Sequence, residues 1–274
     1  RDGHAGRERY DRGAAHNHNK CRLVTMGTLI GSTFRNTLCA EFNGTDEYAY
    51  ADDPSFAGDT AGSFVGWVRL STLLGANGNK TIIAMGMNSG ADNSYISLRQ
   101  FRSAATSNQN RINVAERITN GGTLNAPYGS TALAASTWYH VALLSNGSEY
   151  TIRLNNTLQS LTGTKNGNWF GDLPGGSKRF AMGCGWAINT PFSHADCRLD
   201  EWLYVGGRAL TNAEVTEHYN AGVPVNPHRL SFRGDIDSWW RFGDSRDSAT
   251  TVFDEIGSNH LTLVNMDASN YVAP

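Results

Sequence analysis

The sequence has little charge and no long apolar run. Charged residues make up 18% of the 274 residues and the net charge is -2, whereas an average soluble domain has about 25% charged residues. This balance gives no electrostatic reason to expect binding to nucleic acid or to a membrane surface. No stretch approaches the roughly 20 apolar residues that cross a bilayer. We therefore expect neither nucleic acid nor a membrane as a partner.

Cysteine is scarce as well. The four cysteines are Cys21, Cys39, Cys184 and Cys197, and none forms the C-x-x-C spacing of a metal or redox motif. An even count allows a disulfide, and Cys184 with Cys197 is the pair that could join two strands. A core of this size does not need such a staple. The sequence therefore favours free thiols and leaves the pairing of Cys184 and Cys197 open.

Glycine and aromatic residues are plentiful, with 30 Gly, 11 Phe, 10 Tyr and 7 Trp. Short apolar runs with period-two alternation, separated by Gly, Asn and Asp, predict strands. These runs cover residues 63–69, 81–86, 95–98, 111–114, 138–144, 150–154, 180–183 and 199–205. Asn146-Gly147 lies between two of them and is a strong hairpin signal.

One segment alone has helical features. Residues 211–220 open with Thr211 and Glu214 at capping-box spacing and end at Ala221-Gly222. Many strands with a single short helix predict an all-β protein, an antiparallel jelly-roll β-sandwich.

The chain divides by composition into three parts. Residues 1–37 are rich in Arg, His, Asn and Gly, which predicts an extended N-terminal arm. They hold no apolar stretch of the kind found in a signal peptide, and we expect a neighbouring subunit to hold the arm. Residues 38–222 form the predicted sandwich. Residues 223–274 are expected to add edge strands or a small extra subdomain.

The order of several motifs resembles the laminin-G-like branch of the concanavalin-A-like lectin/glucanase superfamily. The motifs are FNGTDEY (42–48), WYHVA (138–142), YTIRLNN (150–156), LDEW (199–202) and RALTNAE (208–214). The resemblance spans about residues 39–222 and implies a jelly-roll sandwich, with function left open. The later segment DSWWRFGD (237–244) resembles parts of tailed-bacteriophage proteins that carry such domains.

Catalysis is not expected. Retaining glycosidases of this superfamily need two carboxylates on one face of a strand, about 5 Å apart, and the sequence lacks the E-x-D-x-(x)-E pattern. Asp200 and Glu201 are adjacent, so in a regular strand they point to opposite faces. We predict a structural role for them, one buried and one facing solvent, with Arg208 as a candidate partner.

Calcium is the common ion of the superfamily and requires several oxygen ligands. The resemblance makes Asp46, Asp52, Asp53 and Asp59 candidate ligands, with Asn43 beside them. The alternative is that these residues shape turns without a metal. No cofactor is required by the sequence, and Ca²⁺ is kept as an option.

Exposed aromatic rings can stack on the CH faces of sugars. Trp169 and Phe170 lie in a Gly- and Asn-rich loop and are the best ligand-facing candidates, with Tyr128 second. The alternative is that these rings close the end of the sandwich.

Two functions are consistent with these observations. The first is a structural, surface-presenting virion component of a tailed bacteriophage (a capsid decoration, head-fibre or tail protein), located on the virion surface and bound to other virion proteins and to copies of itself as a homo-oligomer. The second is an extracellular, carbohydrate-binding adhesion module that binds cell-surface glycans. Neither function is catalytic.

Overall fold

The computed structural model describes residues 34–244 and 246–274. Most of the predicted arm, residues 1–33, lies outside the described residues. Its last residues lie against the sandwich: the backbone N–H and Oγ1 of Thr37 donate hydrogen bonds to the Asp244 carboxylate at 2.8 and 2.6 Å. Phe34 lies beside the ring of Trp239, with centroids 6.3 Å apart. The arm predicted over residues 1–37 is therefore already packed on the sandwich at residue 34.

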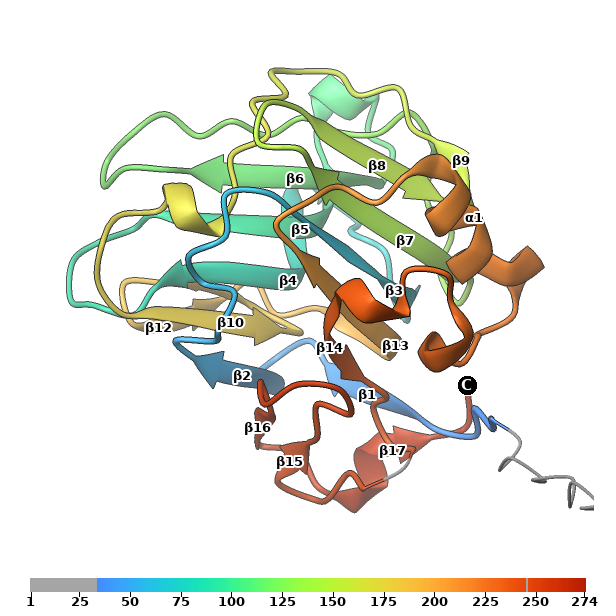
Figure 1. Cartoon of the computed structure of the whole chain (residues 1–274). Helices are drawn as coiled ribbons and strands as arrows, with labels where there is room; N and C mark the ends of the chain where they lie inside the picture. The colour runs from blue at the N-terminus through green and yellow to red at the C-terminus, as the bar shows by residue number, and fades with distance from the viewer. Residues whose placement is uncertain (1–33, 245) are drawn as a thin grey trace, which may run out of the picture. The chain divides into compact units, whose positions relative to one another are not determined.

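Two antiparallel sheets face each other and confirm the predicted β-sandwich (Figure 1). Sheet A has the order β17-β1-β13-β3-β7-β8-β9, with β14 also paired to β13. Its strands are β1 (Cys39–Asn43), β3 (Gly62–Leu70), β7 (Trp138–Ser145), β8 (Tyr150–Leu154), β9 (Thr157–Leu158), β13 (Asp196–Gly206), β14 (Ile236–Trp240) and β17 (Tyr271–Val272).

Sheet B has the order β15-β16-β2-β10-β4-β5-β6. Its strands are β2 (Tyr48–Asp52), β4 (Gly78–Met87), β5 (Tyr95–Arg102), β6 (Arg111–Arg117), β10 (Lys178–Met182), β15 (Thr251–Val252) and β16 (Leu261–Val264). A separate hairpin consists of β11 (Gly185–Ala187) and β12 (Thr190–Phe192). Short 3-10 turns lie at Ala104–Thr106, Phe170–Asp172, Asn220–Gly222, Pro227–Arg229, Arg233–Asp235 and Ala268–Asn270.

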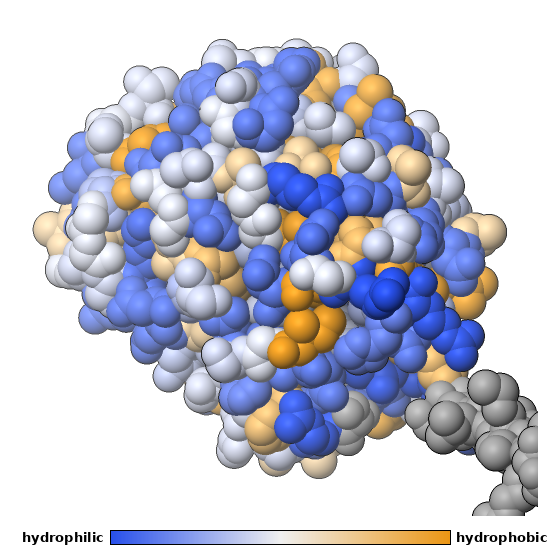
Figure 2. Space-filling view, in the orientation of Figure 1, coloured by the Kyte–Doolittle hydropathy of each residue, from blue (hydrophilic) through white to orange (hydrophobic). Residues whose placement is uncertain are grey.

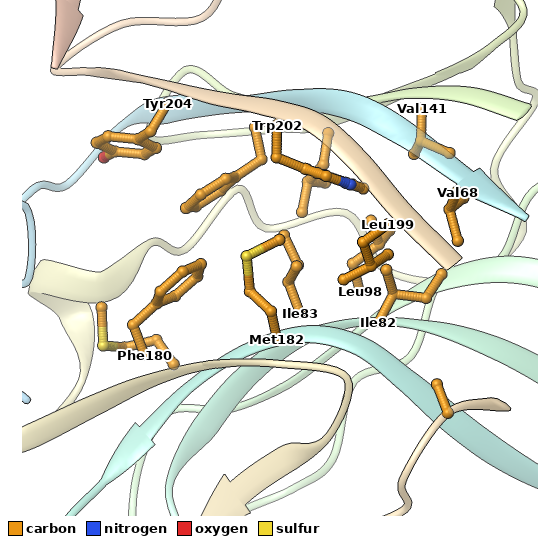
Figure 3. Packing of buried hydrophobic residues seen from close by; sticks show 14 of the residues in the cluster. Val68, Ile82, Ile83, Leu98, Val141, Phe180, Met182, Leu199, Trp202 and Tyr204 are labelled. Atoms are coloured by element: carbon orange, nitrogen blue, oxygen red, sulfur yellow. The ribbon is translucent and has the colours of Figure 1, made fainter. Parts of the chain in front are cut away.

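The main core lies between the two sheets, where alternate residues of each strand meet (Figure 3). Val68, Val141 and Trp202 extend into the core from sheet A, and Phe180 and Met182 extend into it from sheet B. In the run 63–69, Phe64 and Val68 face this core, as the predicted alternation places them on one face. Gly66 has a packing reason to lack a side chain, because a Cβ there would lie 2.4 Å from the Trp202 ring.

A second apolar layer covers the outer face of sheet A. Val65, Leu203 and Val205 point away from the main core and pack under α1 (Asn212–Tyr219) and the segment that follows it. The middle strands of sheet A are consequently buried on both faces, which explains why their sequences are apolar runs with little alternation.

The helix is confirmed. Thr211 is its N-cap and forms the predicted capping box with Glu214. The end differs by one residue from the prediction at Ala221-Gly222, because Asn220 adopts the left-handed C-cap conformation at φ 44°, which Asn tolerates at low cost. None of the helices in the described part of the chain is long and apolar enough to span a membrane.

The C-terminal segment is part of both sheets. β14 pairs with β13 and β17 pairs with β1 in sheet A, while β15 and β16 extend sheet B beyond β2. Trp240 and Phe242 from this segment are fully buried in the main core. Residues 223–274 thus contribute strands and core side chains to the same sandwich as residues 38–222.

Candidate functional site

The β11–β12 hairpin lies on the outer face of sheet B. It rests directly on β4, because a Cβ at Gly86 would lie 1.7 Å from the backbone carbonyl oxygen of Trp186. Gly86 pairs with Tyr95 on β5, and Tyr95 pairs with Arg117 on β6. One row across the sheet therefore consists of a residue with no side chain, an aromatic ring and a guanidinium group. The hairpin lies over the first and leaves space above the other two.

The tip of this hairpin is strained. Ile188 and Asn189 connect β11 to β12, and both have positive φ, 55° and 52°, as a two-residue type I′ turn requires. Asn tolerates this conformation, but a β-branched residue rarely adopts it. Ile188 is also 46% exposed. Strained backbone often marks functional sites, and this strained residue presents an apolar side chain to solvent.

A hollow of about 470 Å³ lies beside the hairpin, and we call it the aromatic hollow. Its lining residues are Asn93, Tyr95, Arg117, Ala187, Ile188, Thr190 and Phe192. The rings of Tyr95 and Phe192 meet edge to face, with centroids 5.3 Å apart. A volume of this size is in the range of small-ligand sites.

Arg117 is the charged residue of the aromatic hollow. Its guanidinium carbon lies 5.8 Å from the centroid of the Tyr95 ring. Among the described residues it forms no ion pair within 4 Å, and its Nε is buried without a hydrogen-bond partner. The hollow therefore combines apolar rings with an uncompensated planar cation, a set suited to a polar organic ligand with an anionic or hydroxyl group.

A second hollow, of about 540 Å³, lies near the far edge of the same sheet, and we call it the polar hollow. It is lined mainly by polar residues, among them Asp52, Asp53, Asn259 and His260. Asp52 is already paired with Arg179 at 2.6 and 2.8 Å, and Asp53 accepts hydrogen bonds from the segment that enters β10. Its carboxylates are thus largely committed to holding strands together.

The four predicted calcium ligands do not form one site. In the described part of the chain, no three His, Cys, Asp or Glu residues are grouped so that they could hold a metal ion. Asp46 accepts a hydrogen bond from Asn43, and Asp59 accepts one from the Tyr204 hydroxyl at 2.7 Å. Burial raises the pKa of the Asp59 carboxyl. Asp46, Asp52, Asp53 and Asp59 are each engaged in loop or strand contacts, and their role as calcium ligands stays a prediction.

The predicted aromatic platform is wrong for Trp169 and Phe170. Trp169 is fully buried and Phe170 is 3% exposed, and the Trp169 indole N–H donates a hydrogen bond to Tyr204 at 3.1 Å. Both rings pack in the main core, because the loop folds back over the end of the sandwich. Tyr128 is half-buried, and its hydroxyl donates a hydrogen bond to the Ala105 carbonyl, so it too is engaged within the protein.

The predicted arrangement of Asp200, Glu201 and Arg208 is also corrected. Asp200 and Glu201 are each only 2% exposed, because β13 bulges at Glu201 (φ 48°) and the bulge breaks the alternation. Glu201 accepts hydrogen bonds from Arg241 and Trp239. Arg208 instead forms ion pairs with Glu214 and Asp235, at 2.7 and 2.6 Å.

Cys184 and Cys197 are separate buried thiols. Burial raises the pKa of each well above that of an exposed thiol, so neither is activated for chemistry. The expectation of free thiols agrees with the structure at these two positions.

The residues of the aromatic hollow were not singled out from the sequence. The sequence places Tyr95 at the start of a predicted strand, leaves Arg117 three residues beyond the predicted run 111–114, and predicts no hairpin beside them. Tyr95 and Arg117 become neighbours through the β5–β6 register. The one local signal was the Ile188-Asn189 pair between two short apolar segments, which is weak because Ile is a poor turn residue.

No family model and no curated protein matches this sequence. Solved structures do match it in fold. A candidate carbohydrate-binding protein from Bacteroides ovatus superposes with a TM-score of 0.57 at 16% identity, covering 88% of this chain and 62% of its own. The CBM40 module of the Ruminococcus gnavus IT-sialidase, solved with α2,3-sialyllactose, gives 0.51 at 15% identity and covers 67% of this chain and 98% of its own.

The leech intramolecular trans-sialidase gives a TM-score of 0.52 at 13% identity, covering 70% of this chain and 29% of its own. This chain therefore spans 62% of the Bacteroides ovatus protein and a smaller part of the trans-sialidase. At these identities the matches establish the fold alone. They agree with the antiparallel β-sandwich that the motif order predicts.

Proposed function

We propose that this protein is a non-catalytic carbohydrate-binding module and that the aromatic hollow is its glycan site. The observation that carries the proposal is the row of Tyr95 and Arg117 beside Phe192, open to solvent on the outer face of a lectin-like sandwich. Two structural neighbours, the candidate carbohydrate-binding protein from Bacteroides ovatus and the CBM40 module, support the same function. They favour the second of the two functions considered from the sequence.

The chemistry of the hollow fits a sugar. The Phe192 ring is half-buried and offers an apolar surface to CH groups of a pyranose. Asn93 and Thr190 supply amide and hydroxyl groups that can exchange hydrogen bonds with sugar hydroxyls. The unpaired Arg117 guanidinium favours a sugar with an anionic group, because a carboxylate can accept two parallel N–H bonds from it.

The lining of the aromatic hollow also supports a non-catalytic role. Glycoside hydrolysis needs a proton donor and a carboxylate at the bond that breaks. The residues that line this hollow include no Asp, Glu, His, Cys or Lys. A bound glycan would therefore be held without a general acid or base beside it.

A secreted or cell-surface location and binding to cell-surface glycans accompany this proposal. The virion-component function, with its virion partners and homo-oligomer, stays a prediction from the sequence. That function predicts that residues 1–37 contact a neighbouring subunit. Chemical cross-linking of purified virions would then give cross-links between residues 1–37 and another virion protein or another copy of this chain.

The test is binding of a panel of neutral and sialylated oligosaccharides to the full chain, first on an array and then by calorimetry. Phe192→Ala and Arg117→Gln are each expected to lower affinity for the best ligand at least about tenfold. A charged hydrogen bond contributes about 1.5–3 kcal/mol, and burying an apolar side chain such as Phe contributes about as much. His260→Ala, an exposed change in the polar hollow, is the matched control and should bind as the parent protein does.

Two results would contradict the proposal. One is a panel with no saturable binding to any glycan. The other is glycan binding that Phe192→Ala and Arg117→Gln leave intact, which would move the site elsewhere. Thermal unfolding of each variant, compared with the parent, separates loss of a contact from loss of the fold.

A further inference from the structure

A third hollow, which we call the indole hollow, lies over the outer face of sheet A, on the opposite sheet from the aromatic hollow. It has a volume of about 140 Å³, and its lining residues are Asn36, Trp67, Trp138, Asp200, Gly222, Pro224 and Pro274. The segment entering β1, the loop after α1 and the C-terminal end therefore come together there (Figure 1). The surface around the three segments mixes hydrophilic residues with small apolar patches (Figure 2).

Three residues of this wall hold a buried polar atom without a hydrogen-bond partner. These atoms are Oδ1 of Asp200, Oδ1 of Asn36 and the indole Nε1 of Trp67. Buried polar groups are rarely left unpaired, because each costs about 1–3 kcal/mol. Two unpaired acceptors and one unpaired donor around a single small hollow indicate that something other than this chain completes the set.

Asp200 is the central feature of the wall. It is 2% exposed, and its other oxygen, Oδ2, accepts a hydrogen bond from the Asn36 amide at 2.8 Å. In the described part of the chain, no Lys, Arg or His nitrogen lies within 4 Å of its carboxylate. Arg241, the nearby cation, is instead paired with Glu201 and Asp244.

The strand register fixes the other walls. Trp67 on β3 lies directly opposite Asp200 on β13, and Trp138 on β7 lies opposite the next outward residue of β3, Arg69. An unpaired carboxylate therefore lies beside two indole rings. Indole faces attract cations through the ring quadrupole, and a carboxylate supplies the counter-charge.

We propose that the indole hollow binds a small protonated amine, with the ammonium N–H groups donated to Asp200 and Asn36 and with the indoles of Trp67 and Trp138 against its alkyl part. The size agrees, because 140 Å³ equals the liquid volume of about five water molecules. That volume suits an amine of about four or five heavy atoms. The unpaired Trp67 N–H is available to an oxygen of the same ligand, so an amino alcohol such as ethanolamine meets all three groups.

The electrostatics give this binding a pH signature. Burial, and then the nearby Glu201 carboxyl, raises the pKa of Asp200 well above its usual range. The other titratable or charged groups around it are Asp244 and Arg241 after β14 and the thiol of Cys39 on β1. On the same face of sheet A lie Arg69 on β3 and His140 on β7. Asp200 therefore gives up its proton at a higher pH than an exposed carboxyl does, and a cationic ligand favours the charged form. Affinity should rise with pH while the amine stays protonated, by up to about tenfold per pH unit.

The experiment uses the full chain with ethanolamine hydrochloride as the probe and ethylene glycol as the neutral probe of matched size. Binding is followed by NMR through the indole N–H signals of Trp67 and Trp138. A saturable shift with ethanolamine and none with ethylene glycol is expected, with an affinity that rises between pH 5 and pH 7.5. Asp200→Asn removes the charge at constant shape and should abolish the shift.

Asp235→Asn is the matched control, because it removes an exposed carboxylate outside the hollow, in the ion pair with Arg208. Trp138→Ala, at a half-buried position, is the second variant and should weaken ethanolamine binding several-fold. It tests the same hollow if Asp200→Asn does not fold. The proposal is overturned if ethanolamine gives no saturable shift, or if affinity is flat or falls with rising pH. It is also overturned if Asp200→Asn binds ethanolamine as tightly as the parent protein does, or if the parent protein binds ethylene glycol as tightly as ethanolamine.

Discussion

Acid should destabilise this protein through a buried pair of histidines. His140 on β7 and His218 on α1 are 0% and 2% exposed, and His140 Nε2 lies 2.8 Å from His218 Nδ1. The Trp67 ring packs edge to face on His140, with centroids 5.2 Å apart. The two ring nitrogens at this distance share one hydrogen. If both rings were protonated, each of these nitrogens would carry a hydrogen and the contact would break.

The size of the effect follows from the pKa values. Burial lowers the pKa of His218 to about 3, from 6.5 for an exposed imidazole, and burial beside His218 lowers that of His140. A folded-state pKa below the unfolded value means that the unfolded chain binds the proton more tightly. The stability is therefore full above pH 6.5 and is lost as pH falls from 6.5 toward 3. At pH 4.5, two pH units below 6.5, His218 alone costs about 3 kcal/mol relative to pH 7.

Buried carboxyls act in the opposite direction over this range, and Glu201 is one of them. Burial raises the pKa of Glu201 to about 7, so its proton is bound more tightly in the folded state, and its contribution grows as pH falls and is lost as pH rises through 7. The histidine effect must therefore be isolated with a variant. His218→Gln removes the titrating ring while keeping a side chain that can hydrogen-bond to His140.

Urea unfolding followed by tryptophan fluorescence at pH 7 and pH 4.5 measures the effect. The parent protein is expected to lose about 3 kcal/mol more than His218→Gln across this interval. Equal losses in the two proteins would refute the reasoning. So would NMR ring signals of His140 or His218 that titrate with a midpoint near 6.5 in the folded parent, a measurement that needs no variant.

Three further predictions follow from single positions. Trp169→Ala should lower the free energy of unfolding by about 3–5 kcal/mol, as for other buried large-to-small changes, and leave glycan affinity of the folded protein unchanged; a large affinity loss with full stability would place Trp169 at the ligand after all. Gly86→Ala should push the β11–β12 hairpin off the sheet and weaken glycan binding, whereas Gly75→Ala, with no atom within 4 Å of its Cβ, should do neither; calorimetry on both variants decides. Denaturation without reductant followed by maleimide labelling and peptide mass spectrometry should find Cys184 and Cys197 both labelled, and a linked pair of peptides would contradict the structure.

The local features of the fold were predictable because they depend on near neighbours in the chain. The capping box of Thr211 and Glu214 needs only three residues and was found where the spacing indicated. The strands follow from apolar alternation, and Asn146-Gly147 does connect β7 to β8. The order of these elements was enough to predict a β-sandwich.

The candidate sites were less predictable, because exposure depends on how loops fold back on the sheets. Trp169 lies in a loop that looks exposed in sequence, yet its ring is inside the core. Asp200 and Glu201 should alternate, but one bulge buries both. Neither a loop closure nor a bulge leaves a periodic trace in the sequence.

The sequence by itself determined the features that repeat along the chain or depend on near neighbours: many short strands, one capped helix and an antiparallel sandwich. The tertiary structure alone decided which polar and aromatic side chains meet. Tyr95 and Arg117 lie in one hollow because β5 and β6 pair in one register. Asp200 and Trp67 lie in the indole hollow because β13 and β3 pair in another register. Register is a long-range choice that depends on burial of whole faces, so the binding chemistry of this surface could be assigned only after the sheets were in place.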